Sequence, residues 1–107
     1  MESKMIELTD ENFEEEVVNS LIPVMVDFYA DWCAPCKVMT PVLETLCGEM
    51  EGDLKIGKVN IENTSISNRY SISNIPTLLM FKNGKVIDRR VGVQNKKALI
   101  ALASGEK

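Results

Sequence analysis

The fold of this chain is decided by residues 24–37, which read VMVDFYADWCAPCK. Residues 24–30 are apolar except for Asp27 and have the length of an ordinary strand. Such a run is typical of a strand that is covered on both faces in a parallel or mixed sheet. Two cysteines follow, at a place where a helix is expected to begin. Residues 24–37 therefore predict a strand, a short loop and a helix that carries a Cys-Ala-Pro-Cys segment.

The expected helix runs from Cys33 to about Met50, because apolar residues recur there at helical spacing. Pro35 falls near its start, where a missing N–H costs little. Pro41 falls in its interior, so we expect a kink at that residue. The apolar positions are Val38, Met39, Val42, Leu43 and Leu46.

Cys33 and Cys36 are spaced so that a helix places their side chains on one face, with Cβ atoms about 5–6 Å apart. Small adjustments at this distance allow a disulfide to form. Cys33 falls in the cap region, where free N–H groups and the positive end of the helix dipole favour a thiolate. We therefore expect Cys33 to attack a disulfide of a substrate, and the more buried Cys36 to resolve the mixed disulfide.

Other interpretations of the pair are a metal site and two inert core thiols. A structural zinc site needs four ligands, whereas the chain has 3 cysteines and no histidine. A zinc or iron–sulfur site shared between two chains stays open, although no metal is expected. The third cysteine, Cys47, lies about 16 Å further along the helix and is too distant to resolve the pair. We expect Cys47 to fill the core, together with Met25, Met39 and Met80.

The composition is that of an ordinary globular protein, and we expect one domain over residues 1–107. Hydrophobic residues make up 45% of the 107 residues and charged residues 26%. The net charge is −4 and the basic residues are scattered, so nucleic acid is not an expected partner. No secretory signal or long apolar span is recognised, which predicts a cytoplasmic protein without membrane association. The absence of histidine excludes Ser-His and Cys-His catalytic pairs.

The other segments alternate between helical and strand patterns, which predicts an α/β domain with a mixed sheet. Thr9 and Asp10 precede an acidic first turn, which indicates a helix start. Asn83 and Gly84 tolerate the positive φ of a tight hairpin turn. Helices are expected over residues 9–18, 66–72 and 95–103, the last with Ala98, Leu99 and Leu102 inward, and strands over residues 55–61, 77–81 and 86–87.

Residues 26–37, VDFYADWCAPCK, resemble the active-site segment of the thioredoxin family. Residues 75–77 (IPT), 81–84 (FKNG) and 91–92 (VG) match later landmarks of that family in order and spacing. The resemblance covers nearly the whole chain. It implies the thioredoxin fold, in which α-helices flank a central mixed β-sheet, and a redox-active Cys33–Cys36 disulfide.

The resemblance also implies the activity, which is that of a thiol–disulfide oxidoreductase. Such a protein reduces protein disulfides and serves electron transport and cell redox homeostasis. No bound cofactor is expected, because the reducing equivalents would come from NADPH through a thioredoxin reductase. That reductase and disulfide-containing client proteins are the expected partners of a monomeric chain.

Three further residues receive roles from the resemblance. Pro76 matches the family's cis-proline, which lies beside the cysteine pair and offers backbone groups to an extended substrate. The residue pattern alone makes Pro76 the start of a strand. Asp27 matches a buried carboxylate that assists proton transfer at the second cysteine, and burial would raise its pKa. Lys58 matches a lysine near that carboxylate, although the pattern alone also allows Asp27 and Lys58 to face solvent.

The surface on which a client protein would dock is implied in the same way, and we call it the apolar collar. Gly92 has a physical reason to be there, since a missing Cβ lets another backbone approach closely. The alternative for Val91 and Val93 is core packing. The apolar collar consists of Trp32, Ile75, Val91, Gly92 and Val93, and the resemblance adds Ala34, Pro35 and Thr77 to the substrate-binding residues.

Two residues depart from the family pattern. Ala34 stands where the family usually has glycine, and its methyl group beside the reactive sulfur is expected to shift redox poise or partner choice. Tyr29 stands where many members have tryptophan, and its hydroxyl needs a partner.

Three other functions are alternatives to that of a reductase. A disulfide isomerase or oxidase usually carries histidine between the cysteines, which this chain lacks. A glutaredoxin-like protein needs a glutathione site, and Trp32 and Lys37 around the pair argue against one. A binding subunit of a larger complex would not need the intact pair.

Overall fold

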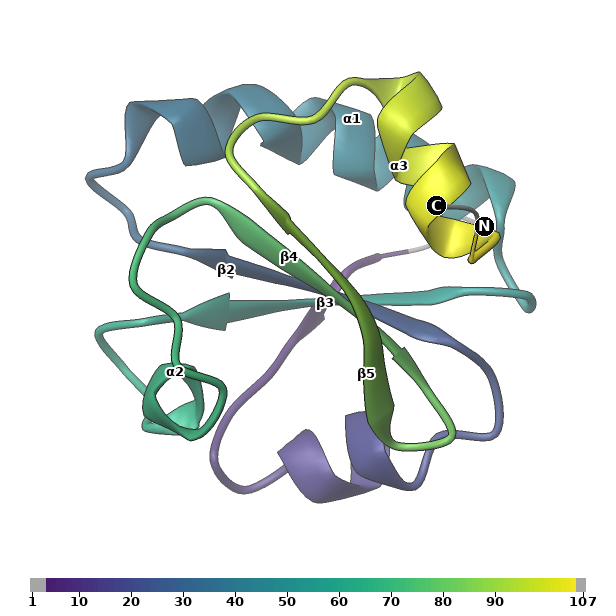
Figure 1. Cartoon of the computed structure of the whole chain (residues 1–107), viewed down its shortest axis with the longest axis horizontal. Helices are drawn as coiled ribbons and strands as arrows, with labels where there is room; N and C mark the ends of the chain where they lie inside the picture. Colours follow the sequence, from purple (N-terminus) through teal and green to yellow (C-terminus); the bar gives the residue numbers. More distant parts are fainter. Residues whose placement is uncertain (1–3, 106–107) are drawn as a thin grey trace.

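The chain is described by a computed structural model that covers residues 4–105. Its centre is a five-stranded sheet with the strand order β1-β3-β2-β4-β5. Strands β1, β3 and β2 are parallel to one another, whereas β4 and β5 are antiparallel to their neighbours, so the predicted mixed sheet is confirmed (Figure 1). The strands are β1 (Ile6–Glu7), β2 (Val24–Tyr29), β3 (Lys55–Asn60), β4 (Thr77–Lys82) and β5 (Lys85–Val91).

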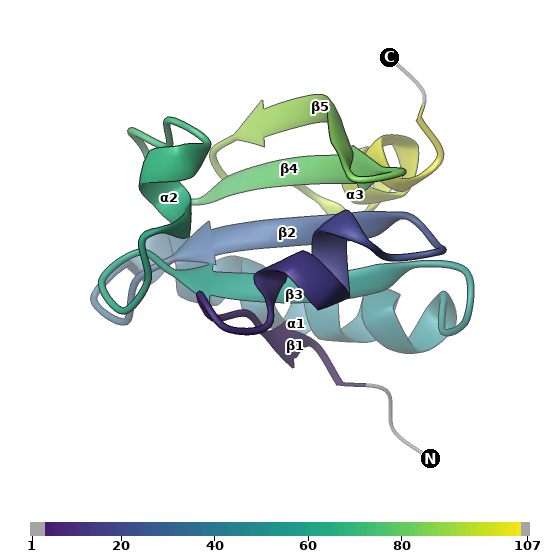
Figure 2. The ribbon, with the colours of Figure 1, turned by 90° about the horizontal axis from the view of Figure 1, so that it is seen from below.

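Helices cover both faces of this sheet (Figures 1 and 2). Helices α1 (Ala34–Glu49) and α3 (Lys96–Ala103) lie on one face. Helices η1 (Glu14–Val18) and α2 (Ile66–Arg69) lie on the other. The thioredoxin fold expected from the sequence is therefore present. The expectation of one domain over residues 1–107 stays a prediction, because residues 1–3 and 106–107 lie outside the described part of the chain.

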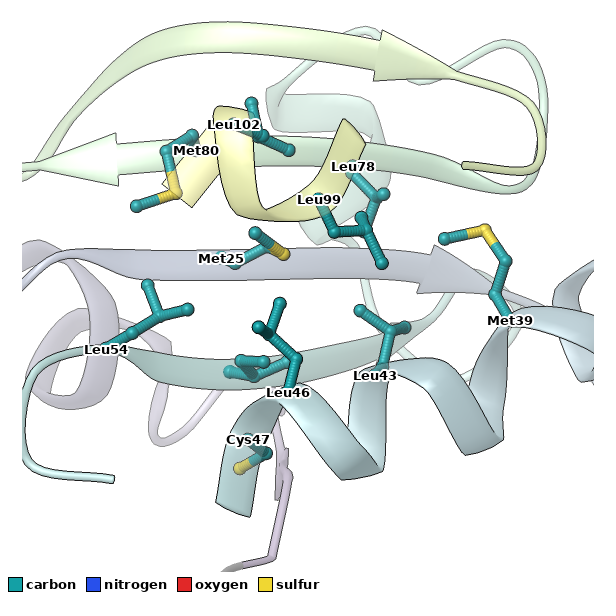
Figure 3. Close-up of a cluster of buried hydrophobic side chains, with 11 residues drawn as sticks. Met25, Met39, Leu43, Leu46, Cys47, Leu54, Leu78, Met80, Leu99 and Leu102 are labelled. Carbon is teal, nitrogen blue, oxygen red and sulfur yellow. The ribbon is translucent and has the colours of Figure 1, made fainter. Parts of the chain in front are cut away.

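The central strand β2 divides the core into two clusters because its side chains alternate between the faces. Val24, Val26 and Phe28 pack with the side of η1 and α2. Met25 packs with the side of α1 and α3, and Figure 3 shows it among labelled side chains of β4, α1 and α3. Asp27 has the same parity as Met25, so it lies on the face that α1 covers.

Helix α1 confirms the helix predicted after Cys33. Cys33 is the N-cap, and Pro35 lies in the first turn. Pro41 lies inside the helix, where a kink stays a prediction. Val38 does not belong to the buried stripe, because its side chain is 63% exposed while Met39 is fully buried.

The first helix begins later than its capping pattern predicted. Thr9 and Asn12 exchange two hydrogen bonds, from the Thr9 N–H to Oδ1 of Asn12 at 2.7 Å and from the Asn12 N–H to Oγ1 of Thr9 at 3.2 Å. This reciprocal cap precedes η1, which is wound as a π-helix with the Asn19 N–H bonded to the Glu14 carbonyl at 2.9 Å. Helix α2 is also shorter than the predicted residues 66–72.

The predicted hairpin and C-terminal helix are confirmed. Asn83 and Gly84 have φ angles of 53° and 79° in the turn between β4 and β5. The side chain of Asn95 caps α3 by accepting the Ala98 N–H at 2.8 Å. Leu99 and Leu102 are buried, and Ala98 is half-buried. Within residues 4–105, no helix has the length and apolar character needed to span a membrane.

Candidate active site at the start of helix α1

The cysteine pair lies where the chain leaves β2 and enters α1 (Figure 1). Cys33 and Cys36 form a disulfide with Cα atoms 5.3 Å apart. The Cys33 N–H donates to the Ala30 carbonyl at 3.1 Å, which holds the loop against the end of β2. The Cys36 N–H donates to Sγ of Cys33 at 3.2 Å. The first turn of α1 thus directs a backbone donor at one of the two sulfur atoms.

The two cysteines are almost equally buried, at 4% exposed for Cys33 and 3% for Cys36. The predicted difference in burial is therefore not present in the disulfide form. Both pack with Ala30 in a small apolar cluster against the half-buried Tyr29 and Ile75. The two cysteine residues differ in the hydrogen bond and the helix N-terminus at Cys33 rather than in the exposed fraction of the residue.

The Ile75–Pro76 peptide bond is cis, as the resemblance implied. Pro76 is buried, and its carbonyl accepts the Gly92 N–H at 2.8 Å. Pro76 has no N–H and its carbonyl already accepts one hydrogen bond, so its role in holding an extended substrate stays a prediction. The free backbone belongs to Ile75, whose N–H and C=O make no hydrogen bond within residues 4–105. The Ile75 side chain packs against the cysteine cluster.

Thr77 does not lie on the exposed surface. It is only 1% exposed, and its hydroxyl donates to the Asn74 carbonyl. The sequence led us to expect Thr77 on the substrate-binding surface, but its buried side chain does not line that surface. It ties the loop before β4 to the strand.

The apolar collar is accessible around the cysteine pair. Trp32 is 66% exposed, Val91 53% and Val93 50%, so these valines are not core residues. Ala34 and Pro35 are also exposed, and Ile75 and Gly92 are half-buried. Gly92 has a φ of 91° with open space where a Cβ would be.

Val38 is a further exposed apolar residue, on α1, that the sequence pattern did not assign to the apolar collar. It follows the buried Cys36 by two positions on α1 and is 63% exposed. Residues offset by two positions on a helix point to different sides. That offset from the buried cysteine was the signal that could have identified it.

Asp27 lies buried in β2, the strand that leads to this site. It is 3% exposed and stands opposite Lys58 of β3 and Leu78 of β4. Among residues 4–105, its Oδ1 is a buried oxygen without a hydrogen-bond partner. Burial raises the pKa of Asp27 to about 7, and the nearby positive charge of Lys58 opposes that shift. The solvent-facing alternative for Asp27 is therefore wrong.

Lys58 is half-buried and turns toward the edge of the sheet. Its Nζ lies 3.6 Å from a carboxylate oxygen of Glu7 and 5.6 Å from the centre of the Tyr29 ring. The Tyr29 hydroxyl donates to the same carboxylate at 3.1 Å, so it has the partner that the sequence required. Burial and the Glu7 charge raise the pKa of Tyr29 to about 12. The sequence pattern did not single out Glu7.

The remaining candidates behave as core residues. Cys47 is a free, buried thiol on α1, in the cluster that α1 and α3 form with the sheet (Figure 3). Met25, Met39 and Met80 are fully buried in the same cluster. In the part of the chain that the structure describes, no three His, Cys, Asp or Glu side chains gather as a metal site.

Comparison with known proteins places this geometry in a family. The thioredoxin family model matches residues 4–104. A thioredoxin of Rickettsia bellii is 47% identical over 94 residues, which cover 87% of this chain and 90% of the relative. Thioredoxin C-2 of Corynebacterium nephridii is 46% identical over 104 residues, with 94% of each chain covered. Thioredoxin 2 of Chlorobaculum tepidum is 45% identical over 97 residues, with 90% and 89% covered.

The cysteine pair at the start of a helix and these similarities point to the same chemistry. The chain is a thiol–disulfide oxidoreductase whose redox pair is Cys33 and Cys36. It belongs to the thioredoxin family.

Proposed function

We propose that the chain reduces the disulfides of client proteins, with Cys33 as the nucleophile and Cys36 as the resolving residue. The observation that carries this proposal is the Cys36 N–H directed at Sγ of Cys33. A hydrogen-bond donor at this sulfur stabilises a thiolate more than a neutral thiol. The N-terminal end of the α1 dipole acts in the same direction. Cys36 lies within the helix and receives no such bond among residues 4–105.

In the proposed reaction the thiolate of Cys33 attacks one sulfur of a client disulfide. The new S–S bond forms as the client's bond breaks, and the departing client sulfur takes up a proton. Cys36 then loses its proton and attacks Sγ of Cys33. The client sulfur that leaves is protonated, so the client gains two electrons and two protons. The chain is left with the Cys33–Cys36 disulfide.

Asp27 is the proposed acceptor of the Cys36 proton. A group with a pKa near 7 can take up and release a proton at neutral pH, which suits a general base. Asp27 also lies on the sheet face that α1 covers, behind the strand end that leads to the cysteines. Lys58 is proposed to adjust this carboxylate by its charge, since the two residues are paired in register.

The apolar collar is the proposed docking surface for clients. Exposed apolar side chains around a reactive group are typical of protein-binding sites. The N–H and C=O of Ile75, which have no partner in the described part of the chain, suit an extended client segment that would add backbone hydrogen bonds beside the disulfide. Ala34 and Pro35 are exposed next to Cys33 and would contact the same segment.

We propose that NADPH reduces the resulting disulfide through a thioredoxin reductase. The chain would then act as an electron carrier in redox homeostasis, as a monomer in the cytoplasm. Similarity to curated thioredoxins over most of the chain supports this step. The test is the equilibrium of the Cys33–Cys36 pair against glutathione, together with turnover by NADPH and a thioredoxin reductase. A pair more reducing than glutathione that is recycled by the reductase supports the proposal. A pair more oxidising than glutathione would indicate an isomerase or oxidase instead.

A further inference from the structure

Glu7, Lys58 and Asp27 form a row across three neighbouring strands of the sheet. Glu7 of β1 is paired in register with Lys58 of β3, and Lys58 is paired with Asp27 of β2. Ile6 packs into the cluster on the opposite face, so Glu7 shares the face of Asp27. Lys58 therefore stands between two acidic residues in the sheet, one on the edge strand and one buried in the central strand.

Lys58 pairs with the carboxylate at the edge. Its Nζ is 3.6 Å from Glu7, and within residues 4–105 no ion pair joins Lys58 to Asp27. Among the described residues, the buried Oδ1 of Asp27 accordingly has no hydrogen-bond partner. A lysine that approached this oxygen would favour the carboxylate over the carboxylic acid.

Tyr29 holds the edge pair in place. Its hydroxyl lies 3.3 Å and 3.1 Å from the two carboxylate oxygens of Glu7. Its ring lies 5.6 Å from the ammonium of Lys58, within range of a cation–π contact. Both members of the Glu7–Lys58 pair are thus in contact with one side chain, which is the residue that departs from the usual tryptophan of the family.

We propose that Glu7 is a positioning residue that holds the Lys58 ammonium away from Asp27 and so keeps Asp27 able to accept a proton. The inference rests on the proposed role of Asp27 in resolution of the mixed disulfide. Without Glu7, the flexible Lys58 side chain would turn toward the only other carboxyl group paired with it in register. Asp27 would then stay ionised to lower pH and become a weaker base.

The other groups around Asp27 do not reproduce this effect. Leu78, which faces it from β4, carries no charge. Tyr29 and Asp31 follow it in the chain, and the high pKa of Tyr29 keeps its hydroxyl neutral near pH 7. At the start of α1 the titratable groups of the site are the N-cap Cys33 and Cys36, which do not titrate as a disulfide. The disulfide form therefore isolates the contribution of Lys58 and Glu7.

The test is an NMR titration of the Asp27 carboxyl group in the disulfide form. Glu7→Gln is expected to lower the Asp27 pKa by roughly 1 unit. Lys58→Met is expected to raise it. In the Lys58→Met background, Glu7→Gln should lower the pKa by less than half as much, because the effect runs through Lys58. Glu51→Gln removes the same charge from the exposed turn after α1 and should cause no shift.

Two results would overturn the inference: no shift in Glu7→Gln, or an equal shift with and without Lys58. The second result would mean that Glu7 acts on Asp27 as a bare charge. The role of Asp27 is tested separately by the pH dependence of mixed-disulfide resolution in Glu7→Gln. If the Asp27 pKa falls while this profile does not move, the positioning by Glu7 stands and the proposed base does not.

Discussion

The N–H of Cys36 donates a hydrogen bond to Sγ of Cys33 across 3.2 Å, in the first turn of α1. The two cysteine residues are buried to nearly the same degree in the disulfide form, whereas this bond and the helix N-terminus act on Cys33. The electrostatic environment therefore distinguishes the two cysteines, and it favours a thiolate at Cys33.

Opposite results are expected from replacing each cysteine. Cys33→Ser should abolish dithiol-driven reduction of a protein disulfide, because the nucleophile is lost. Cys36→Ser should still attack but should accumulate a mixed disulfide with the client, because nothing resolves it. Non-reducing electrophoresis with mass spectrometry identifies the adducts. Cys47→Ser is the matched control and should retain full activity, since Cys47 is buried in the core. Activity in Cys33→Ser, or adducts on Cys33→Ser alone, would reverse the assignment.

Asp27→Asn is expected to stabilise the disulfide form at alkaline pH. The pKa of Asp27 rises from 3.8 to about 7 on folding, so the unfolded chain releases this proton first as pH rises. Burying the Asp27 carboxyl group lowers the free energy of unfolding by an amount that depends on pH. This loss is absent below pH 4, grows between pH 4 and 7, and is complete above pH 7. The variant should gain roughly 2–4 kcal/mol in free energy of unfolding at pH 8 and little at pH 4.

Denaturant unfolding of both proteins at a series of pH values measures this difference. The same variant should resolve mixed disulfides more slowly at neutral pH, since the amide cannot accept the proton. A stability difference that does not change with pH would contradict the raised pKa. An unchanged pH–rate profile would contradict only the proton transfer.

Much of the fold was predictable because its signals are local. The burial of β2 can be recognised from its continuous apolar run, and that of one face of α1 from the spacing of its apolar residues. Both signals lie within a short stretch of the chain. The turn at Asn83 and Gly84 needs positive φ angles, which few residue types adopt. These elements were predicted to within one residue or two at their ends.

The rest depended on contacts between distant segments. Strand β1 has only two residues, too few to show an alternating pattern, and it forms because β3 offers a free edge. Without β1 the pairing of Glu7 with Lys58 was not foreseeable. The burial of Thr77 and the bond between Gly92 and Pro76 likewise arise from how the loop before β4 packs. The cysteine pair itself was predictable because two cysteines three residues apart at a helix start lie on the same face of the helix.

Gly84→Ala is expected to destabilise the chain more than Gly52→Ala. Both glycines have positive φ angles, 79° and 89°, where an L side chain is strained. A Cβ at Gly84 would also lie 2.7 Å from the Val18 carbonyl oxygen, whereas a Cβ at Gly52 meets nothing within 4 Å. We expect a loss of roughly 1–2 kcal/mol for Gly52→Ala and roughly 2–4 kcal/mol for Gly84→Ala. Denaturant unfolding measures both, and equal losses would show that the turn and η1 move apart freely.

Val91→Asp is expected to weaken the docking of protein clients. Val91 is 53% exposed beside Gly92, whose N–H bonds to the carbonyl of Pro76, so a charge there meets the apolar surface of a docked client. We expect KM for a protein disulfide to rise roughly tenfold, a loss of the size found at important interface residues. The rate with a small disulfide, which does not cover the collar, should be unchanged. Val86→Asp is the matched control, since Val86 is 41% exposed near the other end of β5. If both variants raise KM equally, or if the small disulfide is affected as strongly, docking does not depend on the apolar collar.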